Sequence, residues 1–283
     1  MNLFSRKAIT IIFICSLFFN LNNSFAKKTK DDFLKLGDNK KIGQAIAEEY
    51  DDRDLGFNDQ ISKMKMILIN AYGDKNTRLM EARIFERQDR DIGDKSLLLF
   101  FNPKDLNGTA MLSFANILKS DEQWLYLPSL KRVKRISSKN KSGPFVGSEF
   151  AYEDITGNEI NKYEWTFIAT EKCPILDNEC FKLETIPKYE FSGYTKRILW
   201  IDVEEFRLDK IDFFDRKNAL LKTQAFYDYK KYLNKFWRAD KWIMKNHQTE
   251  KSTELLFEKY YFQVGLDDND FHEKALRRIR EWK

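Results

Sequence analysis

Residues 64–87 read MKMILINAYGDKNTRLMEARIFER, and this stretch decides the fold. Its opening six residues are an apolar run with a single lysine, and AYGDK has the composition of a turn. Residues 78–87 then alternate, so that Met80, Ala82 and Ile84 share one face. A period of two residues is the pattern of a β-strand with one buried face. The stretch therefore predicts two strands joined by a tight turn.

The same short-strand pattern continues through most of the chain. Further strands are expected at residues 97–101, 109–116, 123–127, 131–136, 163–167, 181–185, 194–202, 207–215, 220–229, 241–247 and 252–261. Short strands joined by tight turns predict an antiparallel meander. We expect about 11 of these segments to pair in one sheet, and a sheet of that size curls and acquires a concave face. The fold class is mainly β (α+β).

Helical patterns precede, interrupt and follow the strands. Asp38 is placed to cap a helix whose apolar residues Ile42, Ala45, Ile46 and Tyr50 recur at helical spacing. A long irregular segment, residues 137–160, is expected to be a loop with a short helix over 148–155, where Ser148 is a candidate cap. The pattern of residues 271–282 is helical and basic. No long linker divides residues 27–283, which predicts a single domain.

The first residues indicate export. Arg6 and Lys7 precede an apolar run over residues 8–21, and Ser24-x-Ala26 fits the small-x-small rule of signal peptidase. The apolar run is shorter than the roughly 20 residues of a membrane-spanning helix. We expect residues 1–26 to be a signal peptide cleaved after Ala26. The mature chain would then work in the periplasm of a Gram-negative-type bacterium.

Three cysteines are present, and the expected export indicates a role for each. Cys15 lies inside the apolar run after Ile14, which is too large for a lipobox, so Cys15 is expected to leave with the signal peptide. Cys173 and Cys180 flank a turn-like stretch and would meet an oxidising space. Their spacing fits neither a CxxC redox motif nor a zinc site. A structural disulfide between them is the favoured interpretation.

Charge and motifs exclude several functions. The formal net charge is +5, which is too mild to indicate a nucleic-acid partner. The two histidines, His247 and His272, form no cluster, and no nucleophile elbow, metalloprotease motif or phosphate loop is present. The adjacent carboxylates Glu153 and Asp154 point in different directions, which favours a role in fixing the loop. We expect no metal, no cofactor and no enzyme activity.

Two other features of the sequence each allow two interpretations. The basic run Lys131, Arg132, Lys134 and Arg135 is either the solvated face of a strand or a docking surface for anionic headgroups or an acidic partner. Aromatic residues make up 15% of the chain. They are either ordinary core or the lining of a ligand cavity, and the sequence does not separate the two.

Three segments together resemble a known family. They are QWLYLP at residues 123–128, KRVKRI at 131–136 and FVGSEFAYEDI at 145–155. The chain resembles the exported outer-membrane lipoprotein-sorting proteins, which are similar in fold to the periplasmic lipoprotein carrier of the Lol system. The third segment is the most specific of the three. The resemblance covers roughly residues 50–265.

The resemblance implies an incomplete antiparallel β-barrel wrapped around a few helices, with an apolar concave face for acyl chains. It also implies an inner-membrane transporter of the resistance-nodulation type as a partner, and no catalytic residues. We expect a periplasmic carrier of lipid or lipoprotein. The cargo-contacting residues are predicted to be Trp124, Tyr126, Phe145, Phe150, Trp165 and Trp200.

Two rival hypotheses remain. In the first, the core is filled, and the protein is an accessory factor that docks on a transporter or envelope complex without bound lipid. In the second, the protein is a lipid hydrolase or transferase. That hypothesis needs Glu149, Glu153 or Asp154 beside a nucleophile in a pocket.

Overall fold

The structure is a computed structural model that describes residues 28–156 and 159–277. The predicted signal peptide, residues 1–26, and its cleavage site lie outside the described residues. Within the described residues, thirteen strands form one antiparallel sheet. They are β1 (Asp59–Ile69), β2 (Lys75–Phe85), β3 (Lys95–Asn102), β4 (Ala110–Phe114), β5 (Glu122–Leu127), β6 (Arg132–Arg135), β7 (Tyr163–Lys172), β8 (Glu179–Pro187), β9 (Tyr194–Asp202), β10 (Leu208–Asp215), β11 (Leu220–Tyr232), β12 (Phe236–Asn246) and β13 (Ser252–Phe262).

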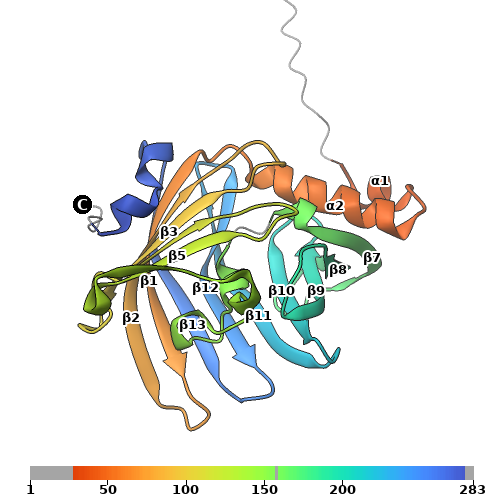
Figure 1. The fold of residues 1–283 in the computed structure, drawn as a ribbon. Helices are drawn as coiled ribbons and strands as arrows, with labels where there is room; N and C mark the ends of the chain where they lie inside the picture. Colours follow the sequence, from red (N-terminus) through yellow and green to blue (C-terminus); the bar gives the residue numbers. More distant parts are fainter. Residues whose placement is uncertain (1–27, 157–158, 278–283) are drawn as a thin grey trace, which may run out of the picture.

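The sheet is an open half-barrel. Its order is β6-β5-β4-β3-β2-β1-β13-β12-β11-β10-β9-β8-β7, so β6 and β7 are its edges and do not pair with each other. Figure 1 shows the strands curling into an open half-barrel. Only the pairing of β1 with β13 departs from a plain meander, and it joins the first half of the chain to the last strand. The mainly β prediction is confirmed, with thirteen strands where about 11 were expected.

The helices are few and short apart from one. The α-helices are α1 (Lys30–Leu34), α2 (Asn39–Asp54) and α3 (Tyr152–Ile155). The 3-10 turns are η1 (Pro128–Leu130), η2 (Ser138–Asn140), η3 (Phe145–Gly147), η4 (Ile160–Lys162), η5 (Asp268–Asp270) and η6 (Glu273–Arg277). Asp38 caps α2, as predicted, by accepting a hydrogen bond from Lys41 N at 2.9 Å. No helix in the described part of the chain is long and apolar enough to cross a membrane.

The short helix in the irregular segment begins later than expected. It covers Tyr152–Ile155 and its N-cap is Ala151, not Ser148. Ser148 instead donates its hydroxyl to the carbonyl of Phe145 at 2.8 Å and ties the preceding turn together. The described part of the predicted C-terminal helix is the 3-10 helix η6.

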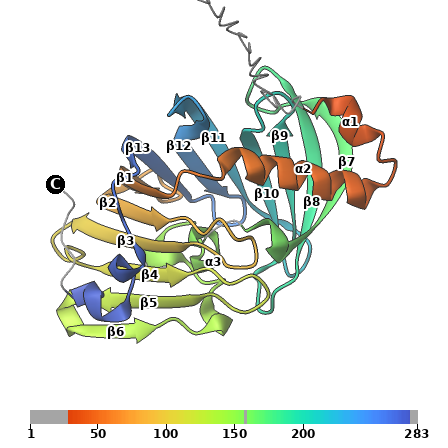
Figure 2. The ribbon, with the colours of Figure 1, turned by 90° about the horizontal axis from the view of Figure 1, so that it is seen from above.

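Helix α2 crosses the sheet close to its β7 edge, and Figure 2 shows it lying over this end of the molecule. Its buried residues include Ile42, Ile46 and Ala47. Gly43 permits the close approach, since a Cβ there would lie 2.8 Å from the backbone of Trp165. One end of the half-barrel is therefore roofed by a helix packed directly on strand backbone.

Apolar side chains gather on both faces of the sheet. The main core lies on the concave face, under α2 and the irregular segment. A second cluster lies on the outer face of β3 and β4, where Phe271 and Leu276 of the C-terminal segment cover Leu97 and Leu112. The third cluster surrounds Cys180. Because both faces are partly apolar, alternation along a strand does not reveal which face is concave.

Candidate functional site

A cavity of about 810 Å³ lies between the concave face of the sheet and α2. Its volume is within the usual range for sites that bind small molecules. The wall is largely apolar and comes from β1–β3 and β10–β13. The apolar lining includes Met64, Met66, Met80, Ala82, Ile84, Leu98, Ile211, Phe213, Phe226, Trp242, Leu255 and Phe257.

Charged residues frame one end of the cavity, which we term the mouth. It lies where the C-terminal end of α2 meets the β9–β10 and β11–β12 turns, and its lining includes Arg53, Lys231, Lys235 and Arg238. Arg238 is held by hydrogen bonds to Asp54 of α2 and to Gln60 Oε1 of β1. The mouth is thus built by ion pairs and hydrogen bonds, whereas the interior is built by packing.

The other end is closed by residues 143–156, which we term the plug. Phe145 and Phe150 are fully buried in the main core. Asp154 Oδ2 accepts a hydrogen bond from Lys222 Nζ at 2.6 Å, and its Oδ1 accepts one from Tyr194 at 2.8 Å. These bonds tie the plug to β9 and β11 across the half-barrel.

Glu153 secures the plug to the chain between β8 and β9. Its carboxylate accepts hydrogen bonds from Gly193 N at 2.8 Å, Ser192 Oγ at 2.9 Å and Tyr189 Oη at 3.1 Å. Burial, reinforced by neighbouring Asp154, raises the pKa of Glu153. The three donors fix the orientation of the Glu153 carboxylate.

Further contacts reach the plug from the β12 and β13 end. Glu149 Oε2 accepts a hydrogen bond from Asn246 at 2.8 Å, and its backbone N–H donates to Thr253 Oγ1 at 3.0 Å. Lys222 also donates to the Glu149 carbonyl at 2.9 Å. Every carboxylate of the GSEFAYED motif therefore fixes the plug in place.

Asp94 is the strongly perturbed acid of the cavity wall. Burial raises the pKa of its carboxyl to about 8, and the nearby Glu159 carboxylate adds to the shift. The Glu159 carboxylate accepts a hydrogen bond from the backbone N–H of Asp94 at 2.9 Å, and burial raises its pKa too. Asp94 therefore keeps its proton to higher pH than an exposed carboxyl does.

None of the six residues predicted to contact cargo lines this cavity, so their contact with cargo stays a prediction. Trp124 and Tyr126 pack in the outer cluster of the sheet. Trp200 also lies outside the main core, and its indole donates to Glu171 at 2.7 Å. These three residues face away from the hollow.

The other three residues belong to the main core but are buried behind the cavity wall. Phe145 and Phe150 fill the centre of the plug. Trp165 packs under α2 and donates its indole N–H to the carbonyl of Ile160 at 2.9 Å. These rings shape the hollow without lining it.

The basic run forms the exposed edge of the sheet. Lys131, Arg132, Lys134 and Arg135 are all exposed, on or beside strand β6. Arg135 pairs with Glu122 of the neighbouring strand. The run lies apart from the cavity and lines no part of it.

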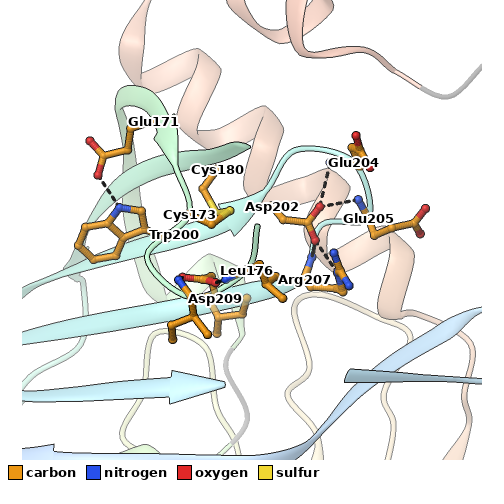
Figure 3. Close-up of a disulfide and its surroundings, with 12 residues drawn as sticks. Glu171, Cys173, Leu176, Cys180, Trp200, Asp202, Glu204, Glu205, Arg207 and Asp209 are labelled. Carbon is orange, nitrogen blue, oxygen red and sulfur yellow. Dashed lines mark hydrogen bonds and ion pairs between the residues drawn. A yellow bond between two sulfur atoms is a disulfide. The ribbon is translucent and has the colours of Figure 1, made fainter. Parts of the chain in front are cut away.

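The predicted disulfide is present. Cys173 and Cys180 are joined by an S–S bond of 2.04 Å across the β7–β8 turn. Figure 3 shows the bond beside Trp200 and Asp209. Asp209 accepts hydrogen bonds from the backbone of Ile175 and Leu176, so the turn that the disulfide closes is also anchored to β10. Among the described residues, no group of His, Cys, Asp and Glu is arranged to hold a metal ion.

The sequence contained a signal for the cavity that the aromatic residues did not provide. Met80, Ala82 and Ile84, placed on one face by the alternation in residues 78–87, all line the cavity. Methionine adapts its shape to irregular apolar partners, so a methionine-rich strand face is suited to a ligand wall. Arg238 and Asp94 carried no such signal, because only the tertiary structure brings them to the cavity.

An open half-barrel with an apolar hollow between a curled sheet and a helix is a LolA-like fold. A family model described as "Uncharacterized protein" matches residues 93–278. No sequence among the curated proteins matches the chain. The solved structures include a putative outer membrane lipoprotein-sorting protein domain from Vibrio parahaemolyticus. It is 50% identical, with a TM-score of 0.81 over 85% of this chain and 100% of that one.

Two further structures are similar. A DUF1329 family protein from Desulfovibrio piger is 26% identical, with a TM-score of 0.79 over 84% of this chain and 99% of that one. A LolA superfamily protein from Nitrosomonas europaea is 19% identical, with a TM-score of 0.66 over 82% and 98%. The chain belongs to the family of outer-membrane lipoprotein-sorting proteins.

Proposed function

We propose that the protein is a periplasmic carrier that binds acyl chains of a lipid or lipoprotein in the cavity and shuttles this cargo within the cell envelope. The observation that carries the proposal is the apolar hollow of about 810 Å³ between the curled sheet and α2. Protein interiors are otherwise close-packed, so a hollow of this size points to an occupant. Its lining of methionine, leucine and aromatic side chains matches a hydrocarbon chain.

The energetics favour such a cargo. Each methylene transferred from water to an apolar site contributes about 0.8 kcal/mol. A chain of about a dozen methylenes would therefore contribute roughly 10 kcal/mol before the costs of association are subtracted. No specific polar contact is needed for tight binding. The polar groups of the cargo would lie at the mouth, near Arg53 and Arg238.

The proposal includes a non-catalytic role. Glu149, Glu153 and Asp154, the carboxylates that a lipid hydrolase or transferase would need, are occupied by hydrogen bonds that hold the plug. An inner-membrane transporter remains a proposed partner for cargo transfer. The exposed basic edge at β6 favours a second candidate, an accessory protein that docks on an envelope complex and carries no lipid.

Native mass spectrometry with lipid extraction tests the proposal. Protein purified without detergent from its own envelope is expected to carry about one lipid or acylated peptide per chain. Apo protein should then take up a fluorescent fatty acid. A clean apo mass together with no uptake would overturn the carrier function and favour the accessory protein.

A further inference from the structure

The β11–β12 hairpin has an unusual tip. Residues 229–239 read YKKYLNKFWRA, with four cations and no carboxylate. Leu233, at the end of the hairpin, is 55% exposed. Lys230, Lys231 and Lys235 surround it and are exposed as well. An apolar side chain held in water amid lysines is the composition of a segment that meets a membrane interface.

The backbone does not account for a leucine at this position. Leu233 and Asn234 are the central residues of a turn in which Lys235 N donates to Tyr232 O at 2.9 Å. Their φ angles are +48° and +54°, the left-handed region that Asn and Gly tolerate and leucine does not. Leu233 therefore adopts an unfavourable backbone conformation, and its side chain is not buried.

The tip is held on a rigid base. Phe236 stacks on Phe262 with ring centroids 5.9 Å apart, and Tyr232 contacts Tyr260 at 5.1 Å. Phe57, just before β1, packs edge-on against Phe236 at 6.2 Å. These rings, partly or fully buried, lie below the turn and position it. A change at Leu233 therefore leaves the packing beneath it intact.

The position of the tip relates it to the cavity. Lys231, Asn234, Lys235 and Trp237 line the mouth, while Leu233 and Lys230 do not. A surface that receives the tip would therefore face the mouth directly. The significance of this orientation, with the mouth toward the surface, rests on the proposed cargo site. The docking itself does not.

Lys230 and Lys231 are available to an anionic surface, whereas Lys235 donates a hydrogen bond to the carbonyl of Leu55. Lys230 pairs with Asp240 at 2.5 Å and Lys231 with Glu205 at 3.8 Å, with the lysine side chains 67% and 40% exposed. Exposed ion pairs of this kind contribute little, so phosphate groups can replace the protein carboxylates.

We propose that the tip of the β11–β12 hairpin docks the protein on an anionic phospholipid membrane. Leu233 inserts among the acyl chains, and Lys230 and Lys231 contact the lipid phosphates. Docking then sets the mouth against the membrane, and cargo enters or leaves without crossing water.

Vesicle flotation of the purified full chain without cargo tests the docking. The vesicles contain phosphatidylethanolamine alone or with phosphatidylglycerol. Wild type is expected to float with the anionic vesicles and to be released by salt. Leu233→Asn should lower partitioning by roughly tenfold, and Lys230→Gln should lower it several-fold and weaken its salt dependence.

The matched control is Leu130→Asn. Leu130 is 51% exposed and precedes Lys131 and Arg132, but the β5–β6 turn lies at the opposite end of the strands. This control should float like wild type. The proposal is overturned if Leu130→Asn loses as much flotation as Leu233→Asn, or if Leu233→Asn floats like wild type. It is also overturned if the protein binds an acidic protein but not the vesicles.

Fatty-acid uptake in vesicle-free solution separates this inference from the carrier function. Neither Leu233 nor Lys230 lines the cavity, so both variants should take up the fluorescent fatty acid as wild type does. If wild type takes up no fatty acid yet floats with the vesicles, the carrier function fails and the docking stands.

Discussion

Lys222 Nζ lies 2.6 Å from Asp154 Oδ2, and these side chains are only 4% and 5% exposed. The pair joins β11 to α3 across the concave side of the sheet. Loss of one partner of a buried ion pair leaves the other charge without compensation. The position of the plug, and therefore the closed end of the cavity, depends on this contact.

Lys222→Met should lower the free energy of unfolding by roughly 3–5 kcal/mol, because Asp154 stays buried without its cation. Urea denaturation followed by circular dichroism measures the change. The matched control is Lys182→Met, which removes a partly exposed pair with Glu171 and should cost at most about 1 kcal/mol. Equal losses in both variants would show that the plug contact has no special importance.

Ala82→Phe should abolish or strongly weaken fatty-acid uptake, since the new ring occupies the hollow that Ala82 lines. The control is Ala225→Phe. Ala225 lies between Gln224 and Phe226, which both line the cavity, so its own side chain faces the other side of the sheet. Titration with a fluorescent fatty acid measures both variants after thermal unfolding confirms that they fold. Unchanged uptake by Ala82→Phe would place the ligand elsewhere.

Asp94→Asn should stabilise the protein at neutral and alkaline pH. The folded protein raises the pKa of Asp94 from 3.8 to about 8, so it binds this proton more tightly than the unfolded chain does. Stability from this group is therefore complete below about pH 4 and is lost as pH rises to about 8. The variant lacks this loss, which is on the order of a few kcal/mol at pH 8.

Urea unfolding across that pH range measures the difference between wild type and Asp94→Asn. Asp177→Asn is the control, because Asp177 is an exposed carboxyl whose pKa the Lys172 ammonium lowers. The control should keep the pH dependence of wild type between about pH 4 and 8. A flat profile in wild type would show that Asp94 titrates normally.

The double variant Cys173→Ala/Cys180→Ala should lower the free energy of unfolding by roughly 2 kcal/mol, as expected for closing so short a loop. The sequence separation of the two cysteines is seven residues. Asp209 still accepts the backbone hydrogen bonds of Ile175 and Leu176, so fatty-acid uptake should persist. Loss of uptake with intact secondary structure would instead connect the turn to the cavity.

Leu233→Asn should raise the free energy of unfolding by up to about 1 kcal/mol, because asparagine tolerates the left-handed backbone at this turn. Thermal and urea unfolding measure the change, with Leu130→Asn as the comparison. A loss of stability in Leu233→Asn would mean that the leucine contributes to packing in the folded monomer.

The strands, the capped helix and the disulfide followed from the sequence. Each depends on neighbours in the chain: a period of two residues, Asp38 before an amphipathic run, or two cysteines around a turn. The motif at residues 145–155 identified the family, although its residues form the plug and not the ligand wall. Local patterns and a specific motif were enough for these conclusions.

The cavity was decided by the tertiary structure. Trp124 and Trp200 lie in strands with the same two-residue period as the strands of Met66 and Met80. In the folded sheet, however, the tryptophans are on the outer face and the methionines are on the concave face. Alternation separates the two faces of a strand without saying which one is concave. That choice depends on the direction in which the sheet curls and on where α2 packs, and both are set by contacts between residues far apart in the chain.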